Sequence, residues 1–357
     1  MGSSVSDTNK AFCILPWIHF HVGLHGRVQP CCISSKPMGN INQESLGEIW
    51  NGEKFRELRA KMLAGKKVKA CKSCYALEDS GAESLRQENN KKFSQHMDLV
   101  QNTDSDGSIT SQPIYWDLRF SNVCNFKCRT CWHGASSKWF DEAKENGNTA
   151  ADQAIIKNIE DVDRFFEENR ELLIQADEFY FAGGEPLIME EHYSLLNLLT
   201  DSGAQPALRY NTNLSLLSFK GRKVTDLWAH FDDVEVMVSI DGIGQHGESI
   251  RTGQNFQKLE DNLRYLLDNT AVRVLISPTI SSLNVGQLPE IYDWWLNAGG
   301  KDEGWYVNIL QRPKEFNIKC IPVDEKAIIV KELKKSQDQF YYSKYARGLS
   351  EILKFIN

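Results

Sequence analysis

The sequence predicts an α/β fold: a partial barrel of six β/α units, preceded by a small cysteine-rich hairpin–helix module and followed by a C-terminal helix. Two observations support this organisation. Six strand candidates alternate with helical patterns after residue 113, and eight of the nine cysteines lie in the first 131 residues. We therefore expect a flexible N-terminus and four further segments: residues 1–10, 11–80, 81–112, 113–315 and 316–357.

Composition narrows the class of protein. The chain has 357 residues and a formal net charge of -7, which argues against general affinity for nucleic acid or anionic membranes. No apolar run approaches the roughly eighteen residues of a membrane span, and residues 1–10 are too polar for a signal peptide. We therefore expect a cytoplasmic protein. Clustered cysteines in a reducing compartment indicate metal ligation rather than disulfides.

The first module is predicted to be a hairpin followed by a helix. Residues 18–22 alternate as a half-buried strand does, residues 23–26 suit a turn, and residues 27–29 return as a second strand. Residues 44–64 carry apolar side chains near helical spacing, with Gly52 interrupting the pattern. A module of this size has little core, so a metal site would give it stability.

Five thiols are available for one four-thiolate site in this module: Cys13, Cys31, Cys32, Cys71 and Cys74. The C-x2-C pair can place two ligands on one tight turn, and the distant cysteines would join the hairpin to the helix. Zinc and an iron-sulfur cluster fit these residues equally well.

The larger domain follows a polar helical stretch and a linker at residues 101–112. Alternating strands and helices imply parallel β/α units with right-handed crossovers. The strand candidates are residues 114–120, 177–181, 207–212, 234–240, 272–279 and 304–309; the main helices are 155–174, 190–200, 259–267 and 288–296.

Two of these strands alternate apolar and polar side chains, although a strand packed on both faces should be almost continuously apolar. In the first strand Asp117, Arg119 and Ser121 form the polar set, and the strand at 234–240 behaves similarly. The polar face is predicted to line a ligand-bearing interior. An exposed edge strand would give the same pattern.

The chemistry centres on Cys124, Cys128 and Cys131, spaced as C-x3-C-x2-C after a strand. Three thiolates can hold three irons of a cubane cluster and leave the fourth open to another ligand. The alternative is a zinc knuckle completed by His133.

A glycine-rich loop, Gly183-Gly184-Glu185, ends the second strand. The glycines allow the backbone to approach a ligand, and the glutamate could accept hydrogen bonds from an ammonium group. An ordinary β-to-α loop would look the same.

Together these motifs resemble the radical S-adenosylmethionine (SAM) superfamily. The resemblance implies a partial barrel, a 4Fe-4S cluster at the three cysteines, and SAM bound at the open iron. It further implies that the Gly183, Gly184 and Glu185 loop contacts the SAM amino group. By the same resemblance Ser239 meets the ribose and Arg251 pairs with the carboxylate, whereas Asn211 and Asn213 form a polar strand end beside SAM.

The first module resembles the SPASM/twitch auxiliary-cluster domain, through Cys13, the segment Gly26-Arg27-Val28-Gln29-Pro30-Cys31-Cys32, and Cys71-x2-Cys74. In that family the domain usually follows the barrel, whereas here it precedes it. The resemblance implies a second 4Fe-4S cluster held by Cys13, Cys31, Cys71 and Cys74. Cys32 is the alternative to Cys31 and would otherwise be a small buried residue.

The expected function is reductive cleavage of SAM to a 5'-deoxyadenosyl radical that abstracts hydrogen from a substrate. The electron donor would be ferredoxin or flavodoxin, and the first-choice substrate is a peptide that is oxidised, crosslinked or epimerised. A small molecule or nucleoside is the alternative substrate, and an iron-sulfur electron-transfer or scaffold protein is the alternative class. Cys320 could return a hydrogen atom to a substrate radical, or be a buried inert thiol.

Overall fold

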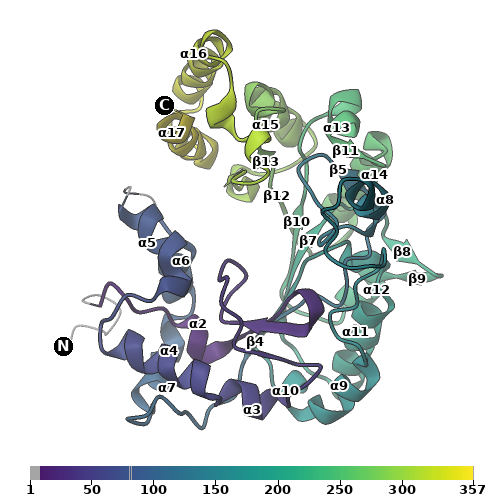
Figure 1. The fold of residues 1–357 in the computed structure, drawn as a ribbon. Coiled ribbons are helices and arrows are strands. Elements are labelled where there is room, and N and C mark those ends of the chain that lie inside the picture. The colour runs from purple at the N-terminus through teal and green to yellow at the C-terminus, as the bar shows by residue number, and fades with distance from the viewer. Residues whose placement is uncertain (1–8, 80, 82, 357) are drawn as a thin grey trace. The chain divides into compact units, whose positions relative to one another are not determined.

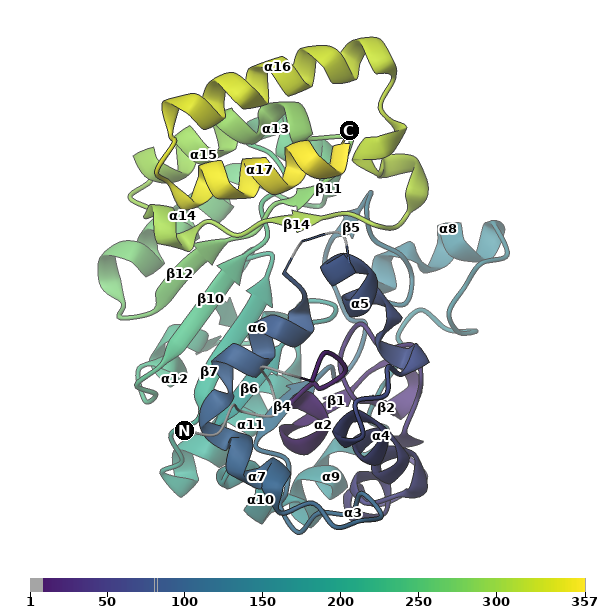
Figure 2. The same cartoon turned by 90° about the vertical axis from the view of Figure 1, so that its left-hand side faces the viewer.

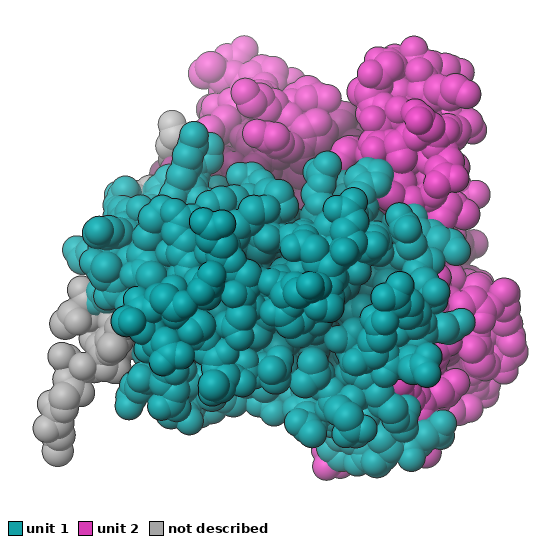
Figure 3. Space-filling model, turned by 60° about the horizontal axis from the view of Figure 1, so that its bottom comes forward, with its two compact units in different colours: residues 1–121, 157–180, 201–206 teal, residues 122–156, 181–200, 207–357 magenta. Residues whose placement is uncertain are grey.

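The computed structural model describes residues 9–79, 81 and 83–356 and confirms the α/β class (Figure 1). The chain forms two compact units, coloured in Figure 3: residues 1–121, 157–180 and 201–206, called unit 1, and residues 122–156, 181–200 and 207–357, called unit 2. Each unit is described separately.

Unit 1 contains a mixed sheet in the order β3-β2-β1-β4-β6. The predicted hairpin is confirmed, because β1 and β2 pair antiparallel and β3 extends them. Strand β1 also pairs in parallel with β4, which pairs in parallel with β6. The cysteine-rich module therefore contributes strands directly to the parallel sheet. The strands are β1 His19–Val22, β2 Arg27–Gln29, β3 Gly39–Asn40, β4 Tyr115–Leu118 and β6 Glu178–Phe181.

Helices cover the apolar face of this sheet. Phe20 packs against Trp50 and Trp116, with ring centroids 6.3 and 5.4 Å apart. The predicted interruption at Gly52 is confirmed, because this residue is the N-cap that separates α3 from α4. The helices of unit 1 are α2 Leu15–Ile18, α3 Leu46–Trp50, α4 Glu53–Leu63, α5 Lys72–Asp79, α6 Leu85–Lys92, α7 Met97–Gln101, α9 Val162–Glu168 and α10 Arg170–Ile174.

Unit 2 contains the parallel strands β7 Ala207–Thr212, β10 Val234–Val238 and β12 Arg273–Ile276, with β10 in the middle (Figure 2). Three small strand pairs accompany them. These are β5 Lys127–Cys128 with β11 Arg251–Thr252, β8 Ser218–Phe219 with β9 Arg222–Lys223, and β13 Thr279–Ile280 with β14 Asn308–Ile309.

The helices predicted at 190–200, 259–267 and 288–296 are confirmed as α11 Glu190–Ser202, α14 Phe256–Asn269 and α15 Leu288–Asn297. The C-terminal extension holds two helices, α16 Val323–Gln339 and α17 Lys344–Ile356, which lie side by side where one was expected. The shorter helices are α8 Phe140–Glu145, α12 Val224–Trp228 and α13 Gly244–Ile250. Among the described residues, none of the helices combines the length and the hydrophobicity of a membrane span.

Two element predictions are wrong. The expected helix at 155–174 starts only at Val162, because the Asp161 side chain caps it, and Asn169 divides it into α9 and α10. The expected strand at 304–309 shrinks to β14, since Gly304 ends a short 3-10 helix. A Cβ at Gly304 would lie 2.8 Å from the Trp295 ring, so tight packing there replaces a regular strand.

The two strands that alternate polar and apolar side chains are both central strands of their sheets. Strand β4 is flanked by β1 and β6, and β10 by β7 and β12, so neither is an edge strand. Asp117 is 1% exposed and Ser121 is 4% exposed. The edge-strand alternative is therefore excluded, and the polar side chains need partners within the fold.

A buried histidine in α11 gives unit 2 a pH-dependent stability. His192 is fully buried, its Nε2 lies 2.9 Å from Tyr210 Oη, and burial lowers its pKa to about 3. The unfolded chain takes up a proton near pH 6.5 and the folded chain does not, so acid favours unfolding by about 1.4 kcal/mol per pH unit between these values.

We expect the free energy of unfolding to fall between pH 7 and pH 4.5 in the unsubstituted protein. In His192→Gln the fall should be smaller by about 3 kcal/mol. Urea denaturation at both pH values measures this difference. The exposed His230 supplies the control, and His230→Gln should follow the unsubstituted protein. An unchanged pH slope in His192→Gln would contradict the assignment.

Candidate cluster and cofactor site

The three-cysteine motif of unit 2 forms a tight loop after β4. Cys128 belongs to β5, where it lies opposite Arg251 of β11. Backbone contacts hold the turn, since the Cys131 N–H donates to Cys128 O at 3.0 Å and Trp139 Nε1 donates to the same oxygen at 3.1 Å. Cys124, Cys128 and Cys131 interact electrostatically with one another, so the structure brings the three predicted ligands together.

Burial, reinforced by the neighbouring thiols, raises the pKa of Cys124 to about 11 and that of Cys131 to about 12. Burial also raises the pKa of Cys128. Arg251 acts in the opposite direction on all three. Such thiols stay protonated at neutral pH unless a cation binds, and a metal centre deprotonates its thiol ligands.

His133 is not available as a fourth ligand. Its Nδ1 accepts the Ala150 N–H at 3.0 Å, and its Nε2 lies 3.0 Å from the carbonyl oxygen of Ala154. Both ring nitrogens therefore bond to the backbone, and the zinc-knuckle alternative loses its proposed ligand. Among the described residues, no three His, Cys, Asp or Glu side chains are arranged to hold a single metal ion. Three thiols without a fourth protein donor fit a cluster with an open position.

The glycine-rich loop packs directly on the cysteine loop. Gly183 and Gly184 have φ values of 80° and 56°, and a Cβ at Gly184 would lie 2.2 Å from Val123 O. The Glu185 N–H donates to the same Val123 oxygen at 2.8 Å. Only glycine permits this approach, which places the loop against the residue before Cys124.

Glu185 connects this loop to the end of β7. Its Oε1 accepts from Thr212 Oγ1 at 2.7 Å and from the Leu187 N–H at 3.0 Å, and its Oε2 accepts the Asn213 N–H at 2.7 Å. The side chain is 1% exposed, and burial raises its pKa. Glu185, which was predicted to bind the SAM ammonium group, thus also accepts three hydrogen bonds within the fold. Its carboxylate keeps lone pairs for a further donor.

Asn125, which the sequence predictions missed, continues the network into the cysteine motif. Its Oδ1 accepts from Asn213 Nδ2 at 2.9 Å, and its Nδ2 donates to Ser215 Oγ at 2.8 Å. The only local signal was its place between Cys124 and Cys128, because Ser215 is distant in sequence. A continuous chain of hydrogen bonds therefore joins the two motifs.

Arg251 lies beside the cysteines and is held by Asp241. Its Nη1 donates to Asp241 Oδ2 at 2.7 Å, and Asp241 Oδ1 accepts the Thr279 N–H at 2.7 Å. The Arg251 Nε is buried and has no hydrogen-bond partner among the described residues. An unpaired buried donor of this kind fits an anionic ligand. The sequence predictions named Arg251 but not its carboxylate partner.

We expect Asp241→Asn to lower the free energy of unfolding by about 3 kcal/mol or more, because it leaves a buried guanidinium without its charge partner. Chemical denaturation measures this loss. The exposed ion pair between Arg164 and Glu168, 2.7 Å apart, is the control, and Glu168→Gln should cause no measurable change. Equal stability of the two variants would contradict the role of Asp241.

The remaining predicted SAM contacts lie at the carboxyl ends of β7 and β10. Asn211 pairs in register with Met237, and the Ser239 N–H donates to Thr212 O at 2.9 Å. Asn211 Oδ1 is buried without a hydrogen-bond partner among the described residues. Parallel sheets bind ligands at this end of their strands. The roles of Asn211, Asn213 and Ser239 toward SAM remain predictions.

A second cysteine group lies in unit 1. Cys13 interacts electrostatically with Cys31, Cys71 and Cys74. Burial is the main cause that raises the pKa of Cys31 to about 12 and that of Cys71 to about 11. These four thiols are the set expected from the sequence, and their donor chemistry fits one four-thiolate centre.

Two other cysteines differ from expectation. Cys32 was expected to be buried but is exposed, and its electrostatic neighbours include Asp117 and Arg119. Cys320 is also exposed, so the buried alternative for it is wrong. Cys320 ends the short 3-10 helix Ile318–Cys320. Its thiol donates to Lys314 O, outside that helix, at 3.2 Å. The hydrogen-donor role of Cys320 remains a prediction.

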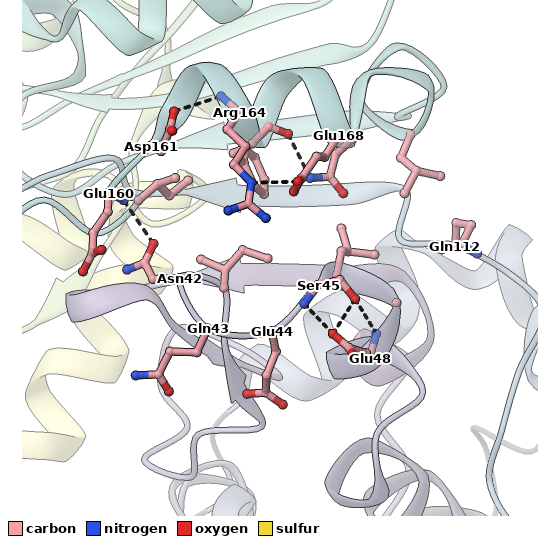
Figure 4. Close-up of a pocket in the computed structure, with 17 residues that line it drawn as sticks. Asn42, Gln43, Glu44, Ser45, Glu48, Gln112, Glu160, Asp161, Arg164 and Glu168 are labelled. Carbon is pink, nitrogen blue, oxygen red and sulfur yellow. Dashed lines mark hydrogen bonds and ion pairs between the residues drawn. The ribbon is translucent and has the colours of Figure 1, made fainter.

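Two cavities each have a volume of about 680 Å³. The cavity in unit 2 opens beside Cys131 and is also lined by Arg129 and Trp132. The cavity in unit 1 lies between α9 and residues 41–48 (Figure 4). Among its acidic side chains, Glu48 and Asp161 cap helices and Glu168 pairs with Arg164. The lining includes none of the predicted site residues.

Two family models match the chain. The radical SAM superfamily model matches residues 118–294, and the model of an iron-sulfur cluster-binding domain, SPASM, matches residues 13–75. The second match confirms the unusual N-terminal position of that domain. No curated protein matches.

Solved structures with similar folds include native anSMEcpe with bound AdoMet, at 16% identity and a TM-score of 0.46, covering 64% of this chain and 60% of that one. Streptococcus suis SuiB bound to S-adenosylmethionine is 12% identical, with a TM-score of 0.45 and coverage of 81% of this chain and 64% of that one. SuiB bound to its precursor peptide SuiA gives 12% identity, a TM-score of 0.44, and 80% and 63% coverage. This chain spans less than two thirds of each of these proteins.

Proposed function

The chain belongs to the radical SAM superfamily, and on this basis we propose that it is an enzyme that cleaves SAM reductively and abstracts a hydrogen atom from a peptide. One observation supports the chemistry most strongly. Among the described residues, the loop of three thiols has no fourth protein ligand. Asn125 and Asn213 join it by hydrogen bonds to the glycine-rich loop that ends at Glu185. A cluster held by these three thiols would keep one position open for an amino acid ligand, and the glycine-rich loop is suited to bind one.

Cys124, Cys128 and Cys131 would hold the 4Fe-4S cluster. When bound and reduced by a ferredoxin or flavodoxin, that cluster with SAM supplies the 5'-deoxyadenosyl radical. The chain contributes placement. Arg251 would offer the SAM carboxylate its Nε, which has no hydrogen-bond partner among the described residues, while Glu185 retains acceptor capacity for the ammonium group.

Hydrogen bonds within the fold orient the two side chains that are proposed to bind SAM. Asp241 fixes Arg251, and the bonds from Thr212 and Asn213 fix Glu185, so both groups are oriented before SAM binds. A preoriented site avoids the entropy of ordering side chains during binding. Burial of Glu185 and Asp241 also excludes water from the charged contacts, which strengthens them.

The SPASM domain supports a second cluster, held by Cys13, Cys31, Cys71 and Cys74. This cluster could accept the electron of the product radical, bind substrate or brace the fold. A peptide is the proposed substrate because SPASM/twitch proteins often modify ribosomally made peptides by oxidation, crosslinking or epimerisation.

Anaerobic reconstitution tests the enzyme proposal. Protein loaded with iron and sulfide is reduced with dithionite and given SAM, and 5'-deoxyadenosine is quantified. We expect 5'-deoxyadenosine to accumulate with methionine in equal amounts. A fully loaded and reduced protein that leaves SAM intact would refute the proposal.

A further inference from the structure

The polar face of the unit 1 sheet carries a row of side chains that spans four strands. In register, Gln29 of β2 lies opposite His21 of β1, His21 opposite Asp117 of β4, and Asp117 opposite Tyr180 of β6. Register partners in a sheet point to the same face. Arg119 follows two residues after Asp117 and thus extends the same face.

Asp117 orients the guanidinium of Arg119. Arg119 Nε donates to Asp117 Oδ1 at 3.0 Å, and Nη2 donates to Oδ2 at 3.1 Å. The Asp117 side chain is 2% exposed, and His21 Nδ1 lies 2.8 Å from its Oδ2. A carboxylate enclosed in this way cannot turn, so it holds the arginine in one orientation.

The opposite edge of Arg119 remains available. Two of its five N–H groups bind Asp117, and no described residue accepts a hydrogen bond from Nη1. The side chain is 28% exposed. Nη1 and the second N–H of Nη2 are therefore neighbouring donors that do not bind Asp117, and a pair of donors on this edge can bind a carboxylate in a bidentate manner.

A second unpaired group lies on the same face. His19, two residues before His21, is 2% exposed, and its Nδ1 lies 3.2 Å from the carbonyl oxygen of Pro30. Its Nε2 has no hydrogen-bond partner among the described residues. With the proton on Nδ1, Nε2 is an acceptor, and burial lowers the His19 pKa to about 4, so the ring is neutral. This face therefore carries N–H donors that can bind a carboxylate, on Arg119, and an acceptor that can bind an N–H group, on His19.

We propose that Arg119 and His19 form a binding site for a carboxylate with a neighbouring N–H group, as in a peptide terminus or an acidic residue, and that this group belongs to the substrate. The identification of the occupant as substrate rests on the proposed function. Cys32, which follows Cys31 in the sequence, interacts electrostatically with Arg119.

The test is protection of Arg119 from phenylglyoxal in the reconstituted, full-length protein, with modification at each arginine followed by mass spectrometry. N-acetylglycine represents a terminal carboxylate, N-acetylaspartic acid α-amide represents an acidic side chain, and N-acetylglycinamide is the uncharged control. We expect a carboxylate probe at about four times its dissociation constant to slow modification of Arg119 about fivefold. The amide should have no effect, and Arg164, with a 71% exposed side chain, should react equally in all samples.

Protection by either carboxylate supports the site and identifies the source of the group. Absence of protection, equal protection by the amide, or parallel protection of Arg164 would overturn it. Arg119→Lys provides a second measurement, because it keeps the charge but loses the planar fork. N-acetylglycine should raise the melting temperature of the unsubstituted protein but not that of Arg119→Lys. Modification does not depend on SAM cleavage, so failure of this site and failure of the enzyme proposal are distinguishable.

Discussion

Cys128→Ala is expected to reduce 5'-deoxyadenosine formation to background. Two remaining thiolates cannot hold a cluster that needs three, and Cys128 is the proposed ligand that lies opposite Arg251 in the β5–β11 pair. Iron content should fall from about eight to about four atoms per chain, because the second site in unit 1 keeps its own cluster. Iron and sulfide analysis, together with chromatography of the nucleoside, measures both effects.

Cys71→Ala is the matched variant for the auxiliary site. It should also lose about four irons but keep the three-cysteine cluster. Cys320→Ala, at an exposed thiol outside both groups, should keep all of its iron. If Cys128→Ala removed all iron, or none, the assignment of two separate clusters would be wrong.

Gly184→Ala is expected to lower SAM cleavage by about a hundredfold, since small displacements in an active site have effects of this size. The added Cβ would lie 2.2 Å from Val123 O at a residue whose φ is 56°. The loop must then move away from the cysteine motif, which takes Glu185 out of its contacts. Initial rates of 5'-deoxyadenosine formation at several SAM concentrations measure the change.

Gly203→Ala separates displacement from backbone strain. Gly203 also has a positive φ, 71°, but a Cβ there would meet no atom within 4 Å. This variant should lose only the stability that a left-handed backbone costs a residue with a side chain, about 1 to 2 kcal/mol, and retain normal SAM cleavage. If Gly184→Ala cleaves SAM as well as Gly203→Ala does, the close approach to Val123 has no part in catalysis.

Local patterns predicted most of the fold. Strict alternation identified β4 and β10, and the helical spacing of leucines identified α11 and α14, because these signals reside in consecutive side chains. The region around Gly304 was predicted wrongly for the opposite reason. Its conformation depends on the ring of Trp295, a contact that no local pattern contains.

The candidate site shows the same division. The three cysteines and the two glycines were recognisable because their spacing carries the chemistry. The partners that orient the site were not: Asn125, Thr212 and Asp241 are common polar residues whose roles depend on which strand ends meet. The zinc alternative was also open until the backbone partners of His133 were known.

By itself, the sequence determined the three-cysteine motif, the glycine-rich loop and the parallel β/α units, because each is encoded by neighbouring residues. Only the tertiary structure decided that the hairpin joins the parallel sheet and that His21, Asp117 and Arg119 meet on one polar face. The physical reason is strand register. Pairing of β1 with β4 joins segments far apart in the chain, and no periodicity within either segment specifies that partner.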